Sequence, residues 1–120
     1  MRLLPGPAEG AVAVTVVSLE MTDPADLVDS AAPAGATMEV VAAARPDLSE
    51  RFYREVGAPW AWVDRLDWPT EKWVEWVDRP EHHLLICRLD GRDAGYAELE
   101  QQEDGDVEIV PLFFARLTPM

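Results

Sequence analysis

The sequence of 120 residues predicts an α+β fold with two early helices, a late three-strand antiparallel meander and one strand near the N-terminus. Two observations carry this prediction. Apolar residues recur every four positions in residues 48–56, which is the spacing of a buried helical stripe. From residue 82 onward the pattern alternates and is interrupted by two Asp-Gly pairs, as in strands joined by tight turns. The length fits one domain, residues 1–120.

The N-terminal region predicts little regular structure apart from one strand. Residues 1–10 are expected to be flexible, and Pro5 interrupts them before an apolar stretch long enough for a signal peptide. We therefore expect a cytoplasmic protein. Residues 11–20 are compact and β-branched, which favours a strand, and residues 22–36 are rich in small residues, proline and acid, which favours a surface loop. Residues 38–44 are a weaker strand candidate, because their alanines also suit a helix.

The first helix is predicted over residues 48–56. Asp47 and Glu50 have the spacing of a capping box, and Gly57 is a typical stop signal. The expected buried stripe has Leu48, Phe52 and Val56, with Tyr53 packing beside it.

The second helix is predicted over residues 70–79, between Pro69 and Pro80, within a segment that holds all five tryptophans. Trp73 and Trp76 fall on one helical face and are expected to be substantially buried. Trp60 and Trp62 lie in the preceding loop, where they either wall a ligand pocket or pack against the domain.

The meander is predicted from strands at residues 84–89, 95–101 and 107–114, joined at Asp90-Gly91 and Asp104-Gly105. Alternation places the side chains of three residues on one face of the middle strand, namely Tyr96, Glu98 and Glu100. That face is either a site for chemistry or the solvated side of the sheet. In the last strand, Glu108 is expected to share a side with Val110 and Leu112.

Charge and cysteine content narrow the classes of function. The chain has 10 basic and 23 acidic residues, a net charge of -13, which opposes binding to nucleic acid. Such a surface favours a cationic small molecule or a basic partner, although it equally suits plain solubility. The single cysteine, Cys87, is expected to be a buried thiol, so we expect no metal site. No apolar run approaches the length of a membrane helix, so no membrane association is expected.

The order of these elements resembles the first half of the GCN5-related N-acetyltransferase (GNAT) fold. The stretches that carry the resemblance are "RFYREVGAPWAWVDRL", "WVEWVDRPE", "DGRDAGYAELE" and "DVEIV". They cover roughly residues 39–110 and match in pattern and order rather than through one diagnostic motif.

The resemblance implies an enzyme that transfers acetyl from acetyl-CoA to an amine of a small molecule or peptide. The strand at residues 107–114 would run beside the pantetheine arm, with the backbone of Ile109 and Val110 pairing with the cofactor. Glu108 would be the general base, because an alkylammonium must lose a proton before it attacks a thioester. The acceptor-side candidates would be Glu98, Tyr96, Trp60 and Trp62, with Glu100 beside them.

The sequence also departs from the family. No glycine follows Gly105, whereas the family binds the cofactor pyrophosphate with a glycine-rich loop after this strand. Pro111 removes a backbone donor and suggests a bulge or an edge. We therefore expect an incomplete domain that binds acetyl-CoA weakly or not at all by itself, and acts as a homodimer or with a complementary C-terminal half. The alternative is a truncated, non-catalytic binding module that acts through self-association or a partner chain.

Overall fold

The computed structural model describes residues 10–13, 15 and 17–114, with side chains up to residue 110. The chain divides into two compact units, Met1–Ala31 and Ala32–Met120. The terminus expected to be flexible, residues 1–10, lies outside the described residues except for Gly10.

In the first unit, the one regular element among the described residues is the short 3-10 helix η1 (Pro24–Asp26). The strand predicted for residues 11–20 is wrong for the residues described there, which have no regular structure and expose apolar side chains such as Val12 and Leu19. The β-branched composition was a misleading signal because a strand is stable only beside a partner that takes its backbone hydrogen bonds. The described part of this unit supplies no such partner.

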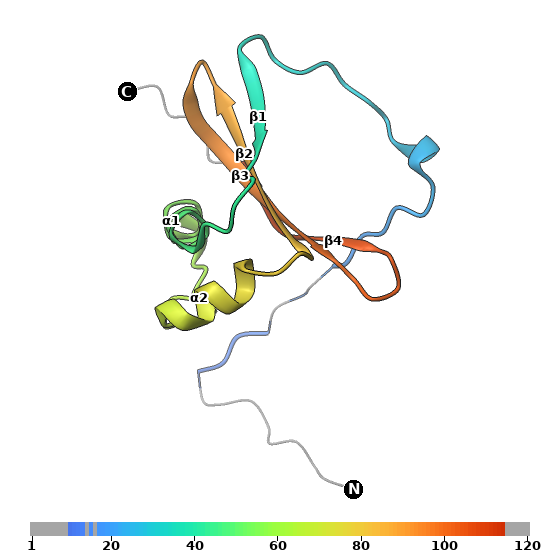
Figure 1. Cartoon of the computed structure of the whole chain (residues 1–120). Coiled ribbons are helices and arrows are strands. Elements are labelled where there is room, and N and C mark those ends of the chain that lie inside the picture. Colours follow the sequence, from blue (N-terminus) through green and yellow to red (C-terminus); the bar gives the residue numbers. More distant parts are fainter. Residues whose placement is uncertain (1–9, 14, 16, 115–120) are drawn as a thin grey trace, which may run out of the picture. The chain divides into compact units, whose positions relative to one another are not determined.

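The second unit contains a four-stranded antiparallel sheet in the order β1-β2-β3-β4, which confirms the α+β class and the meander (Figure 1). The strands are β1 (Ala36–Val40), β2 (His82–Leu89), β3 (Arg92–Gln101) and β4 (Val107–Phe114). Asp90 and Gly91 join β2 to β3 with φ of 51° and 78°, the left-handed pair that a two-residue hairpin turn requires. Of residues 38–44, those up to Val40 form β1, and residues 41–44 have no strand.

Both predicted helices are present, and they lie on the same side of the sheet (Figure 1). Helix α1 spans Pro46–Gly57 and α2 spans Thr70–Val77, with the 3-10 helix η2 (Ala58–Trp60) after α1. Helix α2 ends two residues before the predicted end at residue 79.

The predicted capping box of α1 is wrong. The helix begins at Pro46, whose fixed φ suits the first helical position, so Asp47 lies inside the first turn. Its carboxylate accepts hydrogen bonds from the side chain of Arg45 at 3.0 and 2.9 Å. Glu50 accepts instead from Arg54 at 3.1 Å.

The core lies between the helices and the sheet. Phe52 and Val56 from α1 pack with three buried residues of the meander: Leu84, Ile86 and Tyr96. The rings of Phe52 and Tyr96 stack with their centroids 5.1 Å apart. The predicted stripe of α1 is therefore confirmed, with Leu48 at its partly buried edge.

The two faces of the sheet carry side chains in an unexpected arrangement. The face of β3 with Tyr96 and Glu98 is the one that the helices cover, and both residues are buried. On the opposite face, the more exposed apolar side chains are those of Met38, Val40, Val107 and Ile109. The solvated-side interpretation of Glu98 is therefore wrong, because alternation groups residues by face but does not say which face is covered.

The pairing of β4 with β3 is irregular at its middle, as Pro111 suggested. Ile109 pairs with Leu99 and Leu112 pairs with Ala97, so two residues of β4, Val110 and Pro111, stand against one of β3. The expected alternation that grouped Glu108 with Leu112 is interrupted by this bulge. Glu108 itself pairs with Glu100.

Candidate functional site

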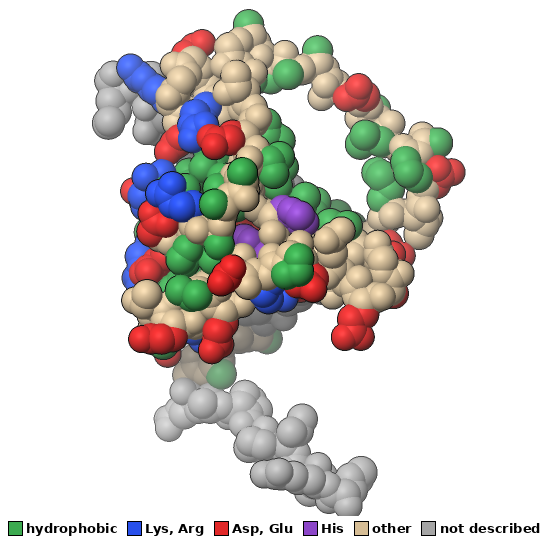
Figure 2. All heavy atoms as spheres, in the orientation of Figure 1, with side chains coloured by type: hydrophobic (Ala, Val, Ile, Leu, Met, Phe, Trp, Pro, Cys, Tyr) green, Lys and Arg blue, Asp and Glu red, His purple; other side chains and the backbone are tan. Residues whose placement is uncertain are grey.

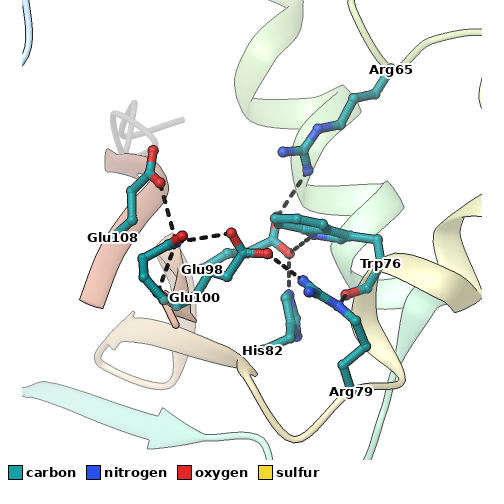
Figure 3. A network of polar contacts seen from close by, with 8 residues as sticks. Arg65, Trp76, Arg79, His82, Glu98, Glu100 and Glu108 are labelled. Atoms are coloured by element: carbon teal, nitrogen blue, oxygen red, sulfur yellow. Dashed lines mark hydrogen bonds and ion pairs between the residues drawn. The ribbon is translucent and has the colours of Figure 1, made fainter. Parts of the chain in front are cut away.

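The centre of the candidate site is the carboxylate of Glu98, which is 0% exposed beneath the helices. Its Oε2 atom accepts a hydrogen bond from Nε1 of Trp76 at 2.7 Å and lies 2.5 Å from Nε2 of His82 (Figure 3). Its Oε1 atom lies 3.6 Å from Nη1 of Arg65. Three separate elements, the connection before α2, α2 itself and the start of β2, thus converge on one residue of β3.

Local sequence explains how these side chains reach Glu98. Helix α2 directs Trp73 and Trp76 toward the sheet, and Trp73 is 1% exposed while Trp76 is half-buried. The T-shaped contact between the rings of Trp76 and His82, with centroids 5.4 Å apart, holds the imidazole against the carboxylate. Tyr53 of α1 fixes the connection by accepting from the amide of Arg65 at 3.1 Å.

The guanidinium of Arg65 lies inside a cage of aromatic rings. Its Cζ atom is 4.8 Å from the ring centroid of Trp68 and 4.7 Å from that of Trp76. Tyr53 and Trp73 complete the surround at 5.7 and 5.9 Å. We call these four rings, together with Glu98, the Arg65 cage. Aromatic faces attract a cation through their quadrupole, and more strongly where water is excluded.

Several polar atoms in this buried region have no hydrogen-bond partner among the described residues. They are Ser49 Oγ, Arg65 Nη1, Trp73 Nε1, Tyr96 Oη and Glu98 Oε1. Burial, followed by the nearby charge of Glu98, raises the pKa of the Tyr96 phenol. The site therefore holds donors and acceptors that no described residue satisfies, which is unusual in a folded interior.

A second, more open set of contacts continues from the buried carboxylate toward β4. Nη2 of Arg79 donates to Glu100 at 2.6 Å, and Nε2 of Gln102 donates to Glu100 at 3.0 Å and to Glu108 at 3.3 Å (Figure 3). The hydrogen bond from Arg79, followed by that from Gln102, lowers the pKa of Glu100. Figure 3 shows the Trp76 indole between the guanidiniums of Arg65 and Arg79.

A pocket of about 360 Å³ opens beside this network, between the β1–α1 connection, the end of α2 and the start of β2. Arg79, His82 and His83 belong to its wall. Figure 2 shows both histidines, coloured purple, on this face of the molecule. The His82 imidazole is only 4% exposed, whereas the Arg79 side chain is 33% exposed.

The structure brings some of the predicted site residues together. Tyr96 and Glu98 lie on the helix-covered face of β3, and Glu108 lies across from Glu100 with its side chain exposed. Ile109 and Val110 lie in β4, which is an edge strand of the described sheet. The Ile109 side chain is exposed on the face away from the helices.

The two loop tryptophans are not equivalent. Trp60 is 69% exposed at the end of η2, whereas Trp62 is half-buried and packs against the core and the ring of Tyr53, 5.5 Å away. Of the two interpretations of this pair, packing therefore describes Trp62. The structure gives Trp60 no such contact with the core.

Sequence reasoning missed Arg65, His82 and Arg79 as partners of the carboxylates. A signal existed for Arg65, which is the only arginine between the first and last of the five tryptophans. His82 begins β2 two residues before Leu84, the residue paired with Glu98. No sequence feature indicated that Glu98 would be buried.

The chemistry available here is recognition of a cation and acceptance of a proton by a carboxylate. Among the described residues, no group of three or more His, Cys, Asp or Glu could hold a metal ion, and no helix is long and apolar enough to cross a membrane. Comparisons with protein-family models, curated proteins and solved structures give no match.

Proposed function

We propose that the chain is a GNAT-type N-acetyltransferase, or the N-terminal half of one, that uses acetyl-CoA and a small-molecule or peptide amine. The chain supplies the part of the site that binds the amine acceptor. We place this activity in the cytoplasm. The observation that carries the proposal is the alignment of Glu98, Glu100 and Glu108 on one side of β3 and β4, running from a buried carboxylate to an exposed one. An amine arrives as a cation, so a row of carboxylates attracts it. The exposed carboxylate at the end of the row, Glu108, can then act as the general base.

The element order supports the same proposal. A strand, two helices on one side of the sheet and a three-strand meander follow one another in the order that the sequence resemblance implies. This agreement concerns order and pairing, and many functions share α+β architectures. The chemistry therefore depends on the carboxylates.

Acetyl-CoA fits one part of the described chain. In the described sheet β4 pairs with β3 alone, so the outer backbone groups of Ile109 and Val110 are available to the pantetheine arm. The described residues show no glycine-rich loop for the pyrophosphate, and the net charge of -13 opposes a polyanion. The proposal assigns the pyrophosphate to a complementary C-terminal half, either in a longer chain or in a partner.

Bound acetyl-CoA supplies an activated acyl group, and the chain prepares the amine. Glu108 takes a proton from the ammonium, and the freed nitrogen lone pair forms the N–C bond as the thioester C–S bond breaks. The thiolate would leave with the bonding pair, and the second proton, lost by the acylated nitrogen, would pass through solvent to protonate it. Glu98 and Glu100 hold the acceptor's positive charge near Glu108 and do not take the proton.

The experiment is reconstitution with a GNAT C-terminal half that carries the glycine-rich loop, followed by measurement of CoA release over a panel of amines. Glu108→Gln should lower turnover at saturating acceptor by a factor of about 10² to 10⁴. Glu103→Gln, in an exposed turn, is the matched control and should not change it. If no amine in the panel is acetylated, the proposal is overturned. If Glu108→Gln and wild type have equal turnover, Glu108 is not the general base.

A second candidate function is a non-catalytic module that pairs with another copy of the chain. The observation that favours it is the sheet face away from the helices, where Met38, Val40, Val107 and Ile109 are each more than half exposed. Two such faces would cover each other's apolar surface. Sedimentation of wild type as a dimer and of Ile109→Glu as a monomer would support this function, whereas a wild-type monomer at high concentration would remove it.

A further inference from the structure

The Arg65 cage has the composition of a site that recognises cations. Three indoles and a phenol surround the guanidinium, and a carboxylate that is 0% exposed lies behind it. The cage is not sealed, since the Arg65 side chain is 13% exposed and Trp68 and Trp76 are half-buried. A ligand from solvent can therefore reach its rim.

Arg65 occupies the cage incompletely. Its Nη1 atom and Oε1 of Glu98 are 3.6 Å apart, both are buried, and neither has a hydrogen-bond partner among the described residues. A close guanidinium–carboxylate pair makes hydrogen bonds of about 2.7–2.9 Å, often two in parallel. The buried Oε1 atom of Glu98 thus faces a cation that makes no hydrogen bond with it, while Oε2 is held by Trp76 and His82.

The segment that delivers Arg65 has no regular secondary structure. Residues 61–69 form no helix or strand, and Val63, Asp64 and Asp67 are exposed. Near Arg65, two hydrogen bonds join the segment to α1: the amide of Arg65 donates to Tyr53, and Arg54 donates to the carbonyl of Leu66 at 3.0 Å. Within the segment, the amide of Leu66 donates to the carbonyl of Val63 and that of Trp68 to the carbonyl of Arg65. Connections outside helices and strands open locally at lower free-energy cost than core elements do.

We propose that the Arg65 cage is a binding site for an alkylguanidinium group, and that Arg65 is an internal occupant which the ligand replaces. The guanidinium belongs either to a free small molecule or to an arginine side chain of a peptide. In the bound state the ligand's planar cation lies among the rings of Trp68, Trp73 and Trp76, with its N–H groups on Glu98. This binding shares Glu98 with the acceptor side of the proposed function, but it needs no acetyl-CoA, so it can be tested separately from acetyl transfer.

The competition gives a quantitative expectation. Wild type binds only in the fraction of molecules from which Arg65 has left the cage, and its apparent affinity is reduced by that fraction. Arg65→Ala removes the competitor, so it should bind the same ligand at least about tenfold more tightly. Glu98→Gln in the Arg65→Ala background should lose most of that gain, because the neutral amide no longer pairs with the cation.

The test is titration of wild type and Arg65→Ala with ethylguanidinium at millimolar concentrations, followed by tryptophan fluorescence and calorimetry. Ethylurea, a neutral molecule of similar shape, is the ligand control, and Arg92→Ala, at an exposed arginine of the hairpin, is the protein control. We expect saturable binding of ethylguanidinium alone, tighter in Arg65→Ala and unchanged in Arg92→Ala. A blocked arginine peptide in a parallel titration distinguishes the two sources of the group.

Two results would overturn the proposal. Binding by Arg65→Ala with none by wild type would show that Arg65 is a permanent structural cation. Equal response to ethylguanidinium and ethylurea would show that the cage does not select charge. If Arg65→Ala does not fold, Arg65→Lys replaces it, because an ammonium fills the planar cage less well and should also raise the affinity for ethylguanidinium relative to wild type.

Discussion

The indole Nε1 of Trp76 donates a hydrogen bond of 2.7 Å to the buried Oε2 of Glu98, which joins α2 to β3 across 22 residues of sequence. The same oxygen contacts His82, so one carboxylate holds two neighbouring elements against the sheet. Glu98 is therefore part of the folding core as well as of the candidate site. Its substitution is expected to affect stability before it affects any binding.

Glu98→Ala should lower the free energy of unfolding by about 3–5 kcal/mol, because it leaves buried polar partners without their acceptor. Urea denaturation followed by tryptophan fluorescence measures this loss. The control is Glu103→Ala, whose exposed side chain should contribute within about 0.5 kcal/mol of zero. A loss for Glu98→Ala as small as that of the control would mean that the carboxylate does not hold α2 on the sheet.

Tyr96→Phe should raise the free energy of unfolding at neutral pH by about 1 kcal/mol. The Tyr96 hydroxyl is buried with no hydrogen-bond partner among the described residues, and removing such a group recovers part of its desolvation cost. A loss of stability beyond about 1 kcal/mol would instead indicate that the hydroxyl makes a stabilising hydrogen bond.

The same substitution should change the response to alkali. Burial raises the pKa of Tyr96 above its ordinary value of 10.0, so above pH 10.0 the unfolded state loses the phenol proton first and the free energy of unfolding falls as pH rises. The unfolding midpoint of wild type should therefore fall more steeply above pH 10.0 than that of Tyr96→Phe. Parallel curves for the two proteins would contradict the raised pKa.

Elements with local signals were predictable from the sequence. Helix α1 follows from its four-residue apolar repeat, and the β2–β3 hairpin follows from Asp90-Gly91, since few residues other than these adopt the left-handed turn. The strand expected at residues 11–20 failed because β-propensity describes how a residue fits a sheet, not whether a partner strand is present.

The candidate site was only partly predictable. Alternation correctly grouped Tyr96 with Glu98, but the burial of that face depends on where the helices pack, which no local pattern determines. The partners of Glu98 come from distant positions, with Trp76 22 residues and His82 16 residues away. Arg65 was missed because a lone arginine in a loop usually indicates a solvated side chain.

Glu100→Gln should reduce stability at neutral pH by less than about 1 kcal/mol, because the Glu100–Arg79 pair is partly exposed, at 21% and 33%, and solvent screens it. The pKa of Glu100 is lowered from 4.5 by Arg79, so its contribution is full above pH 4.5 and is lost as pH falls through the lowered value. The difference in urea midpoint between wild type and variant should therefore vanish in acid. A difference that persists at the lowest pH would contradict this origin.

Gly57→Ala should destabilise the protein, although the same change in an exposed helix interior typically stabilises it by about 1 kcal/mol. A Cβ atom at this position would lie 2.5 Å from Cε3 and 2.7 Å from Cβ of Trp62, so the indole must move away from the core. We expect a loss of roughly 1–3 kcal/mol in urea denaturation. In a Trp62→Gly background the contacts with the ring and with Cβ are both absent, and Gly57→Ala should become neutral or stabilising. A similar loss in both backgrounds would show that the glycine is required for a reason other than its close contact with Trp62.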